Sequence, residues 1–215
     1  METGNSLFNE RHSLAIRLWH WTFFIFISLS ITMVILASTV FNTGDNVAMV
    51  QEEVSARGGN VTMEQARNVA HEFNDKLWML HKYTGVGIAL LLLGRMIIEL
   101  TAKREERLRS KIKRVLRLQF TEGGERQQKR DYLLAKYGYL VFYLLIFIMA
   151  ITGLALVGEN MPFLRSIRRP MKNIHGIVQW GIYVYIFLHL AGVVLAEVSH
   201  SKGIVSRMIH GKRDQ

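Results

Sequence analysis

Four long apolar stretches constrain this chain more than any other feature. They cover residues 16–40, 77–100, 137–157 and 174–198. Each reaches or exceeds the roughly 20 residues that a helix needs to cross about 30 Å of hydrocarbon. Because the backbone polar groups of a lipid-embedded segment must bond within that segment, such stretches form helices. The sequence therefore predicts an all-α fold, a four-helix transmembrane bundle, with residues 1–215 forming a single membrane domain.

The charges of the connections predict the orientation of this bundle. Residues 101–136 contain twelve Lys and Arg against five acidic residues, whereas residues 41–76 contain three against six. The positive-inside rule then places the 101–136 connection and both termini in the cytoplasm, an N-in and C-in arrangement. One connection does not follow the rule, because residues 158–173 would be external yet carry Arg165, Arg168, Arg169 and Lys172. An anionic cofactor group or an acidic partner surface would account for it.

The net charge of +10 is thus mostly charge beside the membrane, and nucleic acid is not an expected partner. Apolar residues recur at helical spacing among the basic residues of the 101–136 connection: Leu108, Ile112, Val115 and Leu116. This pattern predicts a helix lying on the anionic inner leaflet. The 41–76 connection is long for a bundle, which leaves two interpretations, a folded external cap or a passive spacer. Thr62 and Gln65 have the spacing of a capping box that opens a helix.

Four histidines lie within the apolar stretches, where an imidazole is rare and indicates a functional site. His175 and His189 are fourteen residues apart on the last stretch. At roughly 100° per residue they lie within about 40° of one another, and about 21 Å apart along the helix axis. His20 and His81 fall on the first and second stretches. The predicted topology places His20 and His189 at the inner depth and His81 and His175 at the outer depth.

Two pairs of histidines at two depths fit bis-histidine haem better than other chemistry. The chain has no Cys, which excludes thioether attachment of haem and iron–sulfur clusters on this chain. The alternatives are helix–helix hydrogen bonds or interfacial anchoring, and two imidazoles alone make a poor site for other metals. Arg17 and Lys82 lie near His20 and His81, so they are candidate partners of haem propionates or ordinary snorkelling anchors. Arg95, deeper in the second stretch, is a weaker candidate.

Five segments carry a family resemblance: RLWHW, LHKYTGVGIALLLLGRM, GYLVFYLLIFIMAITGLAL, IHGIVQWGIYVYIFLHLAGV and the tail SHSKGIVSRMIHGKR. The first four resemble the helices of the bacterial cytochrome b561 and nickel–iron hydrogenase b-type cytochrome family, and the tail is similar to the end of the hydrogenase subunits. The gamma subunit of membrane formate dehydrogenase has a similar arrangement. The chain departs at Lys172, where hydrogenase subunits often have an additional His, and this weakens the case for hydrogenase as the partner.

The resemblance implies a dihaem b-type cytochrome of the bacterial inner membrane, with His20, His81, His175 and His189 as iron ligands. Its two b haems would pass electrons between membrane quinone and an external redox partner: a hydrogenase-like or other dehydrogenase or reductase subunit, or a cytochrome c. The chain would then be an electron-transfer subunit, since no stretch of it looks like an oxidoreductase active site. The alternatives are a stand-alone quinone-linked superoxide oxidase of the same fold and a haem-free anchor for a complex.

Overall fold

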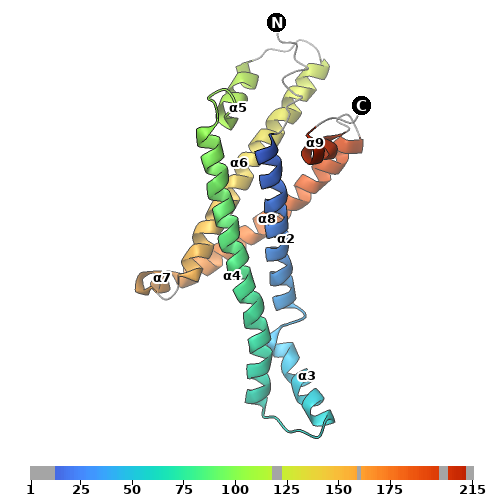
Figure 1. Cartoon of the computed structure of the whole chain (residues 1–215), viewed down its shortest axis with the longest axis vertical. Coiled ribbons are helices and arrows are strands. Elements are labelled where there is room, and N and C mark those ends of the chain that lie inside the picture. The colour runs from blue at the N-terminus through green and yellow to red at the C-terminus, as the bar shows by residue number, and fades with distance from the viewer. Residues whose placement is uncertain (1–12, 118–122, 159–160, 199–202, 212–215) are drawn as a thin grey trace. The chain divides into compact units, whose positions relative to one another are not determined.

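The computed structural model describes residues 13–117, 123–158, 161–198 and 203–211 (Figure 1), and within these residues every regular element is a helix. The helices are α2 (Leu14–Ser38), α3 (Thr43–Ala56), α4 (Met63–Thr101), α5 (Leu108–Arg117), α6 (Gly123–Val157), α7 (Pro162–Ser166), α8 (Arg168–Val198) and α9 (Ile204–His210). The tail that carries part of the resemblance, residues 199–213, is described only from 203 to 211.

Four of these helices are long and apolar enough to cross a membrane: α2, α4, α6 and α8. They contain three of the predicted stretches whole and residues 16–38 of the first, so the prediction of an all-α membrane protein with four spans is confirmed. The last residues of α6 and α8 coincide with the predicted ends, while α4 begins at Met63 rather than near residue 77.

Polar side chains fix where the helices of the 41–76 connection begin. The Asn42 side chain accepts hydrogen bonds from the first turn of α3, at Gly44 N (2.9 Å) and Asp45 N (3.4 Å). The predicted capping box is present before α4, because Thr62 N donates to Gln65 Oε1 (2.9 Å) and Gln65 N donates to Thr62 Oγ1 (3.2 Å). This connection is therefore folded as α3 and the first turns of α4.

The chain divides into two compact units, which are described separately. One comprises residues 22–88, with most of α2, α3 and the first part of α4. The other comprises residues 1–21 and 89–215, with the start of α2, the end of α4 and helices α5 to α9. In the smaller unit, Asn74 Nδ2 donates to the carbonyl oxygens of Ala37 and Phe41, both at 2.7 Å, which ties α4 to the end of α2.

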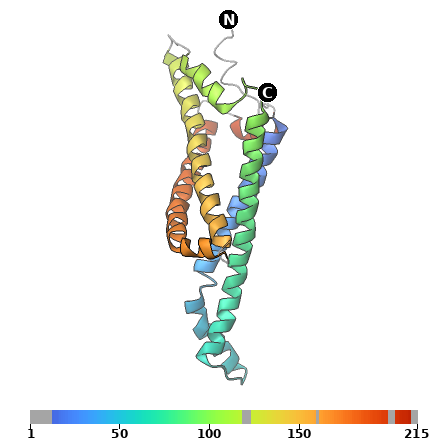
Figure 2. The same ribbon diagram turned by 90° about the vertical axis from the view of Figure 1, so that its left-hand side faces the viewer.

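In the larger unit, α6 and α8 run side by side and are joined through the short helix α7 (Figure 2). Ile146 of α6 and Ile182 of α8 are both buried. Gly181 of α8 lets the helices approach closely, because a Cβ there would lie 3.3 Å from Leu145 Cδ2 of α6.

Helix α5 packs against α6. Ile112 and Val115 of its predicted apolar stripe are buried in the protein, at 7% and 2% exposure, whereas Leu116 is exposed. The position of this helix on the inner leaflet stays a prediction. The apolar stripe of a short helix covers whichever apolar surface is nearest, and here that surface is protein.

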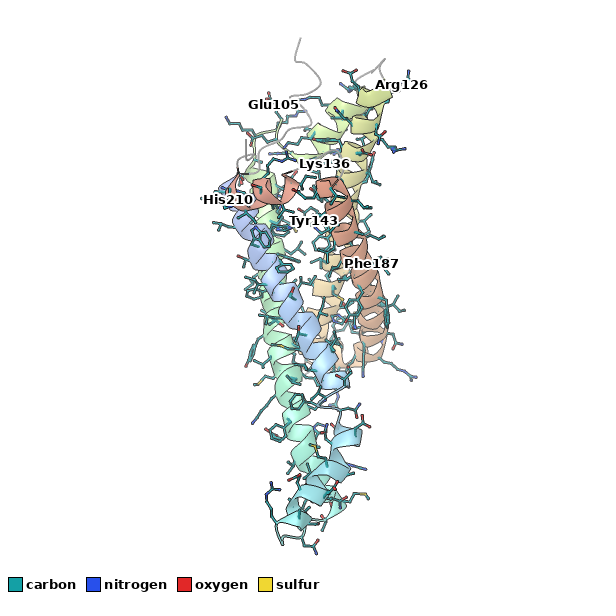
Figure 3. The ribbon with its side chains drawn as sticks, turned by 90° about the vertical axis from the view of Figure 1, so that its right-hand side faces the viewer. Glu105, Arg126, Lys136, Tyr143, Phe187 and His210 are labelled. Atoms are coloured by element: carbon teal, nitrogen blue, oxygen red, sulfur yellow. The ribbon has the colours of Figure 1, made fainter. Side chains whose placement is uncertain are left out.

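Arg126, Lys136 and Tyr143 follow one another along α6 (Figure 3). Lys136 is buried, and its Nζ lies 4.8 Å from the ring centroid of Tyr132 and 5.6 Å from that of Tyr139. Stacking against two aromatic faces stabilises the buried ammonium group electrostatically.

Candidate functional site

His20 of α2 and His189 of α8 lie together within the larger unit. Their ring centroids are 6.4 Å apart, and the ring planes are tilted by 59°. Two imidazoles that bind opposite sides of one metal ion at about 2 Å have ring centres roughly 6 Å apart. The separation therefore fits two axial ligands of one haem iron, and both donors are of the nitrogen type that b haems use. Ligation by this pair stays a prediction.

Aromatic rings surround this pair. Trp21 meets the His20 ring edge-on at 5.4 Å between centroids, and Tyr185 lies almost parallel to the His189 ring at 6.1 Å. Phe142 of α6 stacks on Tyr185 at 4.8 Å. Three helices thus contribute apolar faces around the two imidazoles, which holds the ring orientations and lowers the local dielectric constant.

Helix α9 is fastened beside His20. Arg17 Nη1 donates to Ile209 O at 2.7 Å, and Trp21 Nε1 donates to Met208 O at 3.1 Å. Both acceptors are carbonyls of the last turn of α9, which have no partner inside the helix. At the other end, the Glu197 carboxylate accepts from Gly203 N (2.8 Å) and Val205 N (3.2 Å). The guanidinium of Arg17 is therefore engaged by α9, and its predicted role at a propionate stays a prediction.

His175 of α8 lies against α6 in the same unit. Its Nδ1 is 2.9 Å from Thr152 Oγ1. Gly153 makes room for the ring, because a Cβ at that position would be only 3.3 Å from His175 Cε1. A histidine that binds a metal usually has its second ring nitrogen held by a hydrogen bond, so Nε2 is the nitrogen that would reach iron.

His81 of α4 belongs to the smaller unit and has a similar neighbour. Its Nδ1 is 3.0 Å from Ser30 Oγ of α2, and Trp78 meets its ring edge-on at 5.6 Å. Lys82, the second candidate propionate partner, follows it on α4 with an exposed side chain. The pairing of His81 with His175 stays a prediction, because the two residues belong to different units.

Comparison with known proteins decides the family. A family model described as prokaryotic cytochrome b561 matches residues 11–211, which include all four long helices. The chain belongs to the prokaryotic cytochrome b561 family. No curated protein and no solved structure matches it. As a member of this family, the chain is a multi-pass membrane protein that binds b-type haem and transfers electrons.

A polar cluster of this cytochrome b561 contains Arg95, which the sequence singled out, and Glu99 and Tyr143, which it did not. Arg95, 13% exposed at its side chain, forms an ion pair with Glu99 at 3.0 Å and donates from Nε to the Tyr143 hydroxyl at 3.1 Å. Glu99 also accepts from Leu108 N at 2.5 Å, which fastens the start of α5 to the end of α4. Charges inside an apolar helix indicate function by default. Glu99 follows Arg95 by four residues, a spacing that predicts an ion pair on a helix surface.

Thr152 was missed altogether by the sequence analysis. A lone hydroxyl in an apolar stretch usually bonds back to its own helix, so the sequence offers no sign that it faces a histidine.

Proposed function

We propose that this cytochrome b561 carries two b haems and passes electrons across the bacterial inner membrane between the quinone pool and an external redox partner subunit. The observation that carries the proposal is the 6.4 Å separation of the His20 and His189 rings. Because His175 lies on the same helix as His189, about 21 Å away along the axis, α8 would present one ligand at each depth.

In this proposal the residues of the chain bind the haems and hold the ligands in orientation. His20, His81, His175 and His189 would hold the haem irons through ring nitrogens and would fix the two sites at different depths. Bound haem contributes reversible one-electron chemistry, at a potential that its ligands and their hydrogen bonds adjust. Aromatic rings pack around His20 and His189 and would hold the two imidazoles in orientation.

Haem stoichiometry tests the proposal directly. The pyridine haemochrome of the purified protein should show b-type bands at two haems per polypeptide. A ratio near one would remove one histidine pair, and a colourless protein would favour the haem-free anchor.

The quinone site is proposed beside the His20 and His189 pair. With the N-in and C-in orientation, this pair lies towards the cytoplasmic surface, where the basic residues of 103–117 are also placed. Arg95 and Glu99, near the end of α4, supply the polar side chains that a quinone headgroup would meet. An inhibitory quinone analogue should therefore shift the spectrum of variants that keep this pair. A shift confined to variants that keep only His81 and His175 would place the quinone on the other side.

The partner surface is proposed on the 41–76 connection, which is acidic, helical and external in this orientation. Co-purification from native membranes, followed by identification of bound subunits, is the test. Removing residues 44–70 should weaken partner binding and leave both haem spectra unchanged. Oxidation of superoxide by the purified chain, with no subunit bound to it, would contradict the need for a partner.

A further inference from the structure

The hydroxyl of Thr152 has an unusual position within the apolar helix α6. Its side chain is buried, with 3% of the residue exposed. Oγ1 lies 2.8 Å from Ile148 O and 3.1 Å from Met149 O on its own helix, and 2.9 Å from His175 Nδ1 on α8. Three polar atoms therefore surround one hydroxyl group.

A count of protons indicates which way the contact to His175 runs. The hydroxyl has one proton, and a carbonyl oxygen can only accept. When that proton is donated to Ile148 O, the lone pairs of Oγ1 are left to accept from His175, and Nδ1 must carry the hydrogen. A neutral imidazole protonated at Nδ1 has its lone pair on Nε2, which is the form that binds a metal.

The neighbouring residue supports the same geometry. Gly153 allows the His175 ring to lie against the α6 backbone, next to the hydrogen bond with Thr152. His81 in the smaller unit has a hydroxyl, Ser30 Oγ, at 3.0 Å from its Nδ1. At Thr152, the carbonyl oxygens of Ile148 and Met149 compete for the hydroxyl proton and so set the direction of the contact with His175.

We propose that Thr152 is a positioning residue that holds His175 as the Nδ1-protonated tautomer, orients Nε2 towards the haem iron and adjusts the potential of that haem. The proposal rests on the proposed function, in which His175 is an axial ligand. A hydrogen bond from Nδ1–H makes the imidazole a more basic ligand, which stabilises the ferric state. Removing the acceptor should therefore raise the midpoint potential of this haem alone.

The test compares Thr152→Val, which keeps the shape and removes the hydroxyl, with Thr152→Ser, which keeps the hydroxyl. Redox titration of the purified haem-loaded protein and its low-spin ferric EPR signals are the readouts. Thr152→Val should favour reduction of one haem by about tenfold, an upward shift of about 59 mV for a one-electron couple. Thr152→Ser should keep the midpoint potential of the unmodified protein. Thr101→Val is the matched control, because Thr101 Oγ1 also bonds to two carbonyls of its own helix, Ile97 O and Ile98 O.

Each outcome decides the proposal. If Thr152→Val loses one haem and Thr152→Ser keeps both, the proposal is supported, because only Ser retains the hydroxyl. Unchanged potentials in Thr152→Val, or the same defect in both variants, would overturn it. His175→Ala tests the ligand assignment separately. If this variant keeps both haems, His175 is not a ligand and the role proposed for Thr152 fails with it. If it loses one haem, the Thr152 variants alone decide the role of Thr152.

Discussion

The two ends of helix α8 hold their histidines by different means. At one end, His189 faces a second histidine, and its ring is set by packing against Tyr185. At the other end, His175 is held by a hydrogen bond between its Nδ1 and the Thr152 hydroxyl of α6, and it lies against Gly153. One ring is oriented by apolar faces and the other by a single polar atom.

The difference predicts different sensitivities. Aromatic packing is distributed over several side chains, so that loss of one neighbour changes the site gradually. A hydrogen bond to one hydroxyl is all or none, and it acts directly on the electron density of the imidazole. We expect the His175 end to respond sharply to small substitutions and the His189 end to respond chiefly to loss of a ligand.

Removal of the ligands themselves should have the largest effect. His20→Ala and His189→Ala should each lose the same potentiometric component, because their rings lie 6.4 Å apart and would bind one iron. His81→Ala and His175→Ala should each lose the other component. Redox titration of the four variants measures this, with His71→Ala, an exposed histidine of α4 paired with Asp75, as the control. Loss of one component by both His20→Ala and His81→Ala would show that the pairs are assigned wrongly.

The sequence predicted the spans and the histidine face because both depend on local periodicity. Hydropathy places the ends of α6 and α8, and a fourteen-residue spacing brings two residues to one helix face whatever the neighbours are. The contact of Thr152 with His175 depends on how α6 is rotated against α8, which no local pattern encodes. The burial of Ile112 and Val115 against protein could not be predicted for the same reason, since an amphipathic helix fits a lipid surface and a protein surface equally well.

A substitution at Gly153 should have a smaller effect, confined to one end of α8. In Gly153→Ala, the new Cβ would lie 3.3 Å from His175 Cε1, so the ring must move by a few tenths of an ångström. Overpacking of this kind costs about 1–3 kcal/mol. We expect both haems to be retained and the EPR signal and potential of only the His175 component to shift. Gly192→Ala is the control, because nothing lies within 4 Å of a Cβ at that position. Equal shifts in both components would contradict the separation of the two ends.

The smallest effect is expected at Arg17, and it should appear only near the His20 end. Arg17→Gln shortens the side chain and removes the charge that bonds to Ile209 O, so the last turn of α9 loses a partner for its carbonyls. A partly exposed hydrogen bond of this type contributes about 1 kcal/mol, which corresponds to roughly fivefold more frequent local opening. Amide hydrogen exchange of residues 204–210 should rise by about that factor, while the spectrum of the His175 component stays unchanged. Arg114→Gln on α5 is the matched control. If exchange in α9 is unchanged, then Trp21 and Glu197 hold the helix without Arg17; if the His175 component shifts as well, the two ends of α8 are coupled.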